Sequence, residues 1–213
     1  YILGYTTPEE YAENLSSTAP YFDLEVRNFG VLHSGPKSSA GNTSYDNIYN
    51  AAVLWEKISL VSTQRSKQGI VFIYDTFVAA GAAVAFPGQR AVNCPDSWMS
   101  NSLNYNSFVN GGAWGNAHEY NHNFQGYGCN GNDGEVTNNA ISLVEYSLFT
   151  NISSHRQMGG YGGSGLSGWN CYTSATWALN KVNKGDIGGT NGLAMYATLL
   201  HNLGQEAFMS ASL

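Results

Sequence analysis

The sequence predicts an α+β fold, with a small sheet-containing N-terminal part and a mainly helical C-terminal part. A sheet is indicated by residues 24–32, where apolar and polar side chains alternate, and by the short apolar run at 70–74. Helices are indicated by apolar side chains that recur at helical spacing, most clearly between residues 44 and 63. Together these patterns favour helices packed on a small sheet.

The length of 213 residues suits one domain with a substantial core. We expect an α/β part at about 1–110 and a helical part at 111–213. The chain opens without a methionine and shows no signal peptide, so we expect a piece of a longer protein.

The composition limits the kinds of partner. Charged residues make up 11% of the chain, the net charge is -6, and only 9 residues are Lys or Arg. This balance argues against nucleic acid or an anionic membrane as the main partner. No apolar run approaches the roughly 18 residues that span a bilayer. Polarity comes instead from Asn, Ser, Thr, Tyr and Gly, which suits neutral ligands such as glycans or peptide backbone.

Local patterns place the elements of the first part. Thr7-Pro8-Glu9-Glu10 combines an N-cap, a proline at the first helical position and a glutamate after it, which predicts a helix over 8–16. The Gly-, Ser- and Pro-rich residues 33–42 predict a loop. Small side chains at 79–88 would let a backbone approach closely, as at the wall of a cleft.

The second part is expected to be helical around Gly-rich loops. A Gly-rich lead at 110–115 precedes a helix with two histidines, and a Gly- and Asn-rich loop at 126–134 follows it. Another helix is predicted over 135–149. Two more are predicted near 173–182 and 193–203.

The stretch His118-Glu119-Tyr120-Asn121-His122 indicates a metal site. Two histidines four residues apart on a helix lie one turn above each other, so both imidazoles can reach one Zn²⁺. The glutamate beside the first is then placed to act on a metal-bound water. The same spacing could also arise on a surface helix with two unconnected histidines, so a third ligand is needed to decide.

Glu135 is the best candidate for that ligand. It follows His122 by thirteen residues, across a loop rich enough in glycine for the chain to reverse. Two imidazoles and one carboxylate leave a fourth position open for water, as a catalytic zinc site requires. A third histidine six residues after His122 would indicate the metzincin arrangement, but Gly128 stands there. Near Glu135, a polar outer shell is offered by Asn138, Asn139, Ser142 and Tyr146.

These residues carry a resemblance to a known family. The segments GAWGNAHEYNHNFQ at 112–125 and GEVTNN at 134–139 resemble the M60 (enhancin-like) metallopeptidases, whose pattern is a G-x-W-G lead, HExxH, a spacer and a glutamate. The resemblance covers about residues 70–213. It implies a zincin-like metallopeptidase fold of the gluzincin type. Asn121 is a departure, since family members commonly have glycine there.

The resemblance also implies a reaction and a substrate class. His118, His122 and Glu135 would be zinc ligands, and Glu119 would be the catalytic base. Many members act on mucins or other O-glycosylated proteins, so we expect a secreted or cell-surface zinc endopeptidase that cleaves such glycoproteins. The alternatives are an enhancin-like protease on another extracellular protein and a non-catalytic scaffold or binding protein.

The remaining candidate residues are less specific. Substrate contacts are expected from six side chains, several of which could equally be structural: Trp114, Asn138, Asn139, Tyr146, Tyr161 and Trp169. The donor that stabilises the oxyanion could be Tyr146, His155, Tyr161 or His201. The cysteines, at positions 94, 129 and 171, allow one disulfide or three free thiols.

Overall fold

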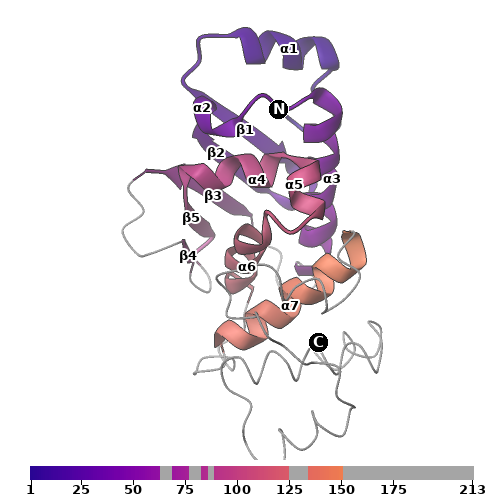
Figure 1. The fold of residues 1–213 in the computed structure, drawn as a ribbon, viewed down its shortest axis with the longest axis vertical. Helices are drawn as coiled ribbons and strands as arrows, with labels where there is room; N and C mark the ends of the chain where they lie inside the picture. Colours follow the sequence, from indigo (N-terminus) through magenta and orange to yellow (C-terminus); the bar gives the residue numbers. More distant parts are fainter. Residues whose placement is uncertain (63–68, 77–82, 86–88, 125–133, 151–213) are drawn as a thin grey trace, which may run out of the picture. The chain divides into compact units, whose positions relative to one another are not determined.

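The structure is a computed structural model that describes residues 1–62, 69–76, 83–85, 89–124 and 134–150. Its contacts divide the chain into two compact units, Tyr1–Phe124 and Gln125–Leu213. The first unit holds a sheet and most of the described helices (Figure 1). In the second unit, the described element is helix α7 (Gly134–Phe149), close to the predicted helix 135–149. The expected division after residue 110 stays a prediction about domains.

The sheet of the first unit has five strands in the order β1-β2-β3-β5-β4. Strands β2, β3 and β5 are parallel neighbours, whereas β1 and β4 pair antiparallel at the two edges. The predicted strand at 70–74 is confirmed as β3. The strands are β1 (Tyr21–Val26), β2 (Val31–Pro36), β3 (Ile70–Asp75), β4 (Val84–Ala85) and β5 (Ala91–Pro95).

The helices α1 and α3 form where the capping residues and the apolar periodicity of the sequence predict them. Helix α1 begins with the expected capping box, in which Thr7 Oγ1 accepts from Glu10 N at 3.2 Å and Glu10 Oε2 accepts from Thr7 N at 2.9 Å. The predicted helix at 44–63 is confirmed as α3. The helices are α1 (Pro8–Ser16), η1 (Arg27–Phe29), α2 (Lys37–Ala40), α3 (Tyr45–Ser62), η2 (Asp96–Trp98), α4 (Met99–Leu103), α5 (Tyr105–Val109) and α6 (Trp114–His122).

Two predictions about the first part of the chain are wrong. Residues 24–32 are not one strand, because the chain turns through η1 and Gly30, whose φ of 66° suits glycine, before β2 begins. Residues 33–42 are not a loop, because β2 continues to Pro36 and α2 follows it. Position 35 of β2 is glycine because a Cβ there would come 2.7 Å from Tyr74 Cβ on β3.

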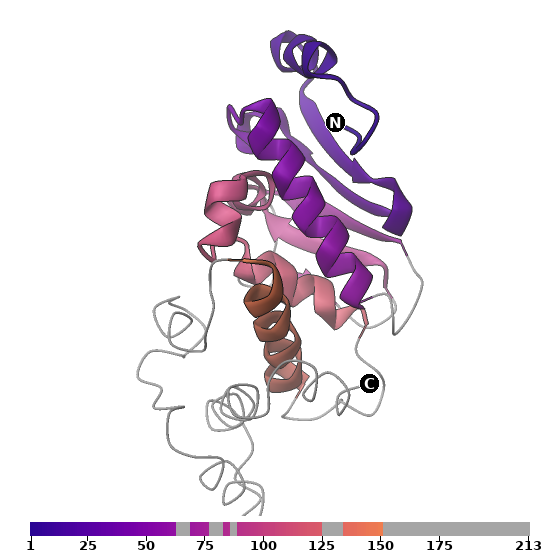
Figure 2. The same ribbon diagram turned by 90° about the vertical axis from the view of Figure 1, so that its right-hand side faces the viewer.

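One face of the sheet is the core of the first unit. Along β3, Ile70, Phe72 and Tyr74 are buried, whereas Ile73 is 43% exposed. The same alternation runs through β1, β2 and β5. Helix α3 lies along this buried face (Figure 2). No described helix combines the length and hydropathy needed to cross a membrane.

Trp55 of α3 lies at the centre of that core. It is fully buried, and its ring centroid lies 5.0 Å from Phe72 on the sheet, 5.2 Å from Phe108 on α5 and 5.8 Å from Tyr120 on α6. Its Nε1 donates to Ser102 O at 3.1 Å, so the indole is both packed and hydrogen-bonded. A single side chain thus connects the sheet to the helix that carries the histidines.

Two glycines before and within α6 are required by close packing. A Cβ on Gly112 would come 2.1 Å from Ser107 Oγ, and one on Gly115 would come 2.6 Å from Trp98 Cζ3. Helix α6 therefore approaches η2 more closely than any other residue at position 115 would allow.

The burial of His33 makes stability depend on pH. Burial lowers the pKa of His33 to about 3, so the folded protein keeps this imidazole neutral. The unfolded chain takes up a proton near the ordinary pKa of about 6.5, so the free energy of unfolding should fall as pH drops below that value. The His33→Gln variant lacks this proton, and the two unfolding free energies should converge by up to about 1.4 kcal/mol per pH unit. Urea unfolding from pH 7 to 4 measures this, and parallel curves would contradict a neutral buried histidine.

Gly115→Ala should destabilise the protein, although this change usually stabilises a helix by about 0.4–1 kcal/mol. The added methyl group meets the Trp98 ring, and such overpacking costs about 1–3 kcal/mol. In a Trp98→Leu background the same change should cost less, because the ring is gone. Denaturant unfolding of the two single variants and the double variant measures this coupling; additive effects would show that the contact does not matter.

Candidate metal centre

Helix α6 has a buried face and a more open face. Among its residues, Asn116, Ala117, Tyr120 and Asn121 are buried, while His118 and Glu119 are half-buried. The inward ring of Tyr120 lies parallel to Phe72, with 9° between the planes and 5.9 Å between the centroids. The helix therefore packs on the sheet through one side, and His118 and His122 project from another.

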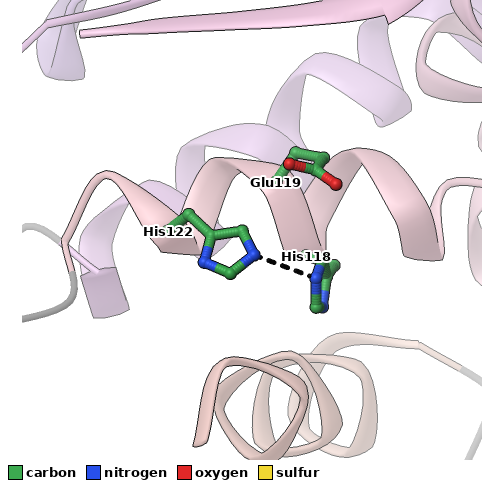
Figure 3. Close-up of side chains that lie close together, drawn as sticks. All are labelled: His118, Glu119 and His122. Atoms are coloured by element: carbon green, nitrogen blue, oxygen red, sulfur yellow. Dashed lines mark hydrogen bonds between the residues drawn. The ribbon is translucent and has the colours of Figure 1, made fainter. Parts of the chain in front are cut away.

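The two histidines come together as the spacing predicts. Their Nε2 atoms lie 3.1 Å apart, and the rings are nearly perpendicular, at 89°. Figure 3 shows the two imidazoles side by side along α6, joined through these atoms. Two neutral imidazoles can form this hydrogen bond only if one carries its proton on Nε2 and the other on Nδ1. Each ring therefore turns the same nitrogen toward one shared point.

This separation fits a shared metal ion. With zinc–nitrogen distances of about 2.0–2.1 Å, two nitrogens 3.1 Å apart subtend about 100° at the metal, close to the tetrahedral angle. The ligand atoms of His118, Glu119 and His122 all lie within 4.8 Å of one another. Nitrogen donors paired with an oxygen donor suit zinc and its neighbours in the transition series better than calcium or magnesium.

Glu119 groups with the two histidines and also lies near the buried thiol of Cys94. Burial raises the pKa of the Cys94 thiol on β5, and the nearby Glu119 carboxylate raises it further. Cys94 is therefore a neutral, free thiol rather than a metal ligand. A neutral Cys94 adds no charge beside the Glu119 carboxylate.

Asn121, at the position where glycine is common in the resembling family, has a definite structural partner. Its Oδ1 accepts a hydrogen bond of 2.7 Å from Ser62 Oγ at the end of α3, and Asn121 itself is 1% exposed. This contact fixes α6 against α3 beside the two histidines. The departure from the family pattern therefore adds an anchor and leaves the candidate ligands in place.

Other predicted residues fall on α7 or beyond the described chain. On α7, Asn138 and Tyr146 are fully buried and Asn139 is half-buried, whereas Trp114 on α6 is 9% exposed. Glu135 lies in the first turn of α7. Outside the described residues lie Tyr161, Trp169, His155, His201, Cys129 and Cys171. The roles predicted for these residues, as substrate contacts, third ligand, oxyanion donor or disulfide partners, stay predictions.

The structure also places residues near the site that the sequence analysis did not single out. Ser62, Cys94 and Tyr74 reach α6 from a helix end and two strands. Their distance from the motif along the chain explains the omission, because no local spacing connects them to His118. Only strand pairing brings β3 and β5 together beneath the helix.

Sequence comparison supports one family over the whole chain. The sequence pattern described as Peptidase M60, enhancin and enhancin-like, matches residues 1–211. "Antigenic protein P1" of Entamoeba histolytica is 33% identical over 223 residues, which cover 98% of this chain and 19% of that protein. "Antigenic protein NP1" of the same organism is 33% identical over 147 residues, which cover 66% of this chain and 22% of that protein. The chain spans about a fifth of the length of these relatives.

Solved structures share the fold at low sequence identity. A conserved protein of unknown function from Bacillus anthracis aligns with 100% of this chain and 44% of its own, at a TM-score of 0.69 and 17% identity. A metallopeptidase in complex with Tn antigen aligns with 97% of this chain and 41% of its own, at a TM-score of 0.53 and 18% identity. A metallopeptidase from Bacteroides thetaiotaomicron gives a TM-score of 0.54 at 16% identity, over 100% of this chain and 39% of its own.

These comparisons agree with the geometry. The predicted α+β metallopeptidase fold is confirmed, with the His-Glu-x-x-His group on a helix beside a five-stranded sheet. The match over residues 1–211 extends the resemblance from the motif to nearly the whole chain, which belongs to the peptidase M60 family of enhancin and enhancin-like proteins.

Proposed function

We propose that the chain is the catalytic domain of a zinc-dependent endopeptidase. The observation that carries the proposal is the Nε2–Nε2 distance of 3.1 Å between His118 and His122, with the Glu119 carboxylate in the same group. Two histidines one helical turn apart that present the same nitrogen to one point, with a carboxylate in the same group, can share one metal ion. Membership in a peptidase family supports the same conclusion.

Glu135 is proposed as the third ligand. It opens the described helix that follows His122 in sequence, and a carboxylate completes a His₂Glu set that leaves one position for water. Asn138 and Tyr146, both buried on the same helix, are proposed to act near it, as outer-shell partners or on the substrate.

A bound zinc ion would supply Lewis acidity and an acidic water molecule. Glu119 would accept the proton of the attacking water and then deliver it to the leaving amine. His118 and His122 would hold the ion through their Nε2 atoms. The residue that stabilises the oxyanion stays open among Tyr146, His155, Tyr161 and His201.

The sheet offers a way to hold an extended peptide. Strand β4 (Val84–Ala85) is an edge strand of the described sheet, and α6 packs against it. An edge strand can pair with the backbone of an extended peptide, which orients the peptide without reading its side chains. Such backbone recognition suits an endopeptidase.

The proposed substrates are mucin-type or other O-glycosylated proteins, and the proposed location is extracellular. Support comes from the related metallopeptidase solved with Tn antigen and from the low charged content of 11%, which favours neutral ligands. The proposed substrate contacts stay the six side chains of Trp114, Asn138, Asn139, Tyr146, Tyr161 and Trp169.

Metal binding and turnover should separate in two variants. Glu119→Gln should bind zinc like the unmodified chain but lose about 10²–10⁴-fold in turnover, because the general base is missing. Glu135→Gln should weaken zinc binding at least as much as the 10–100-fold typical of outer-shell changes, because a ligand is lost. Zinc affinity by competition with a chromophoric chelator and peptide cleavage measure the two properties.

The matched control for both variants is Glu9→Gln, which removes one negative charge from the exposed first turn of α1. It should change neither zinc affinity nor turnover. Normal cleavage by Glu119→Gln would remove Glu119 from its proposed role. Unchanged zinc affinity in Glu135→Gln would remove Glu135 from the ligand set.

Glycan dependence is tested with mucin glycopeptides and their deglycosylated counterparts, each with and without a chelator. The proposal expects cleavage of the glycosylated peptides alone, and its loss with the chelator. Equal cleavage of both sets would leave a metallopeptidase without glycan preference. Zinc binding without any cleavage would instead favour a binding or scaffold protein.

A further inference from the structure

A buried polar network lies beneath α6, on the side away from the histidines. Its centre is the Tyr74 hydroxyl on β3, which donates to Ser102 Oγ on α4 at 3.0 Å. The same oxygen lies 2.9 Å from His33 Nδ1 on β2 and accepts from Asn116 Nδ2 on α6 at 3.2 Å. The second proton of the Asn116 amide points to Cys94 Sγ on β5, at 3.9 Å.

The hydrogen-bonding capacity of the Tyr74 hydroxyl matches its three neighbours. The Tyr74 hydroxyl has one proton, given to Ser102, and two lone pairs, which accept from Asn116 and from His33. With Tyr74 donating to Ser102, His33 donates from Nδ1; in the reverse arrangement Ser102 donates to Tyr74, and Tyr74 donates to His33 Nδ1. The lowered pKa of this buried imidazole supports the neutral form. Every hydrogen-bonding position of the Tyr74 hydroxyl is then used.

Helical geometry separates the network from the proposed ligands. At about 100° per residue, Asn116 is about 200° from His118 and only about 40° from Tyr120. Asn116 and Tyr120 therefore hold the inner side of α6, while His118 and His122 occupy the opposite side. The contacts of Tyr120 with Phe72 and Trp55 are broad ring contacts, whereas the Asn116 hydrogen bonds depend on direction.

We propose that Tyr74 and Asn116 are positioning residues that fix the rotation and axial register of α6, and thereby the geometry of the His118–His122 pair. The proposal rests on the metal site of the proposed function. Aromatic packing resists separation of the helix from the sheet but allows small slides and rotations, which the Ser62–Asn121 hydrogen bond limits at one point of the helix. Hydrogen bonds from one amide to two strands remove that freedom.

The experiment compares Tyr74→Phe with Tyr11→Phe. Tyr11 is a matched control, because it is also buried and its hydroxyl donates to a backbone oxygen, Thr43 O at 2.7 Å, away from α6. Both variants lose one buried hydroxyl. Only Tyr74→Phe removes the hydroxyl that His33, Ser102 and Asn116 share.

Two measurements are made on each variant. In metal-free protein, hydrogen exchange of the α6 amides should become at least about 10-fold faster in Tyr74→Phe relative to α3, and stay unchanged in Tyr11→Phe. Competition with a chelator should show zinc binding about 10–100-fold weaker in Tyr74→Phe alone. Asn116→Ala, which breaks only the connection to α6, should reproduce both effects if Tyr74→Phe does not fold.

The outcomes distinguish this inference from the proposed function. If the unmodified chain binds zinc and both tyrosine variants bind it equally well, the positioning role is overturned and the metal site stands. If the unmodified chain binds no zinc, the proposed function fails and the inference about the metal fails with it. Equal hydrogen-exchange rates of the α6 amides in both variants would overturn the proposal that Tyr74 and Asn116 fix the position of the helix.

Discussion

The packing of Tyr120 against the sheet is the interaction on which the rest of the site depends. The ring lies flat on Phe72 and meets Trp55 of α3, so one residue of α6 contacts both layers of the first unit. Because residues 118 and 122 are two positions on either side of Tyr120, burying this ring turns both histidines away from the core. The orientation of the proposed ligands follows from a hydrophobic contact that neither of them makes.

The low charged content of the chain goes together with a buried polar network of neutral groups in the first unit. Tyr74, Asn116, Ser102 and His33 join neutral donors and acceptors, whereas the ion pair of Arg27 and Glu25 lies at the surface. Neutral networks avoid the cost of burying charge. In such surroundings a divalent ion, Glu119 and the proposed ligand Glu135 would be the main charges of the proposed metal site.

Sequence reasoning succeeded where structure is encoded locally. The capping box at Thr7, the periodicity of α3 and the spacing of His118 and His122 each lie within a few turns of chain. It failed between residues 24 and 42, because Gly30 and Gly35 look alike in sequence. One turns the chain at positive φ, while the other lies in β2 beneath a tyrosine of a neighbouring strand. Short elements such as β4 and α5 depend on pairing and packing that no local pattern shows.

The proposed metal site likewise combines residues that a local pattern reveals with residues that only the fold brings near. The residues proposed to touch the ion lie mainly in one motif, which is why a five-residue pattern can reveal them. The residues that hold the motif in place come from strands and helices up to 59 positions away, as in the Ser62–Asn121 pair. These contacts can change in sequence while the motif stays intact, and Asn121 in place of the family's common glycine is such a change. Intact ligands therefore do not guarantee an equally well-ordered site, since order depends on residues outside the motif.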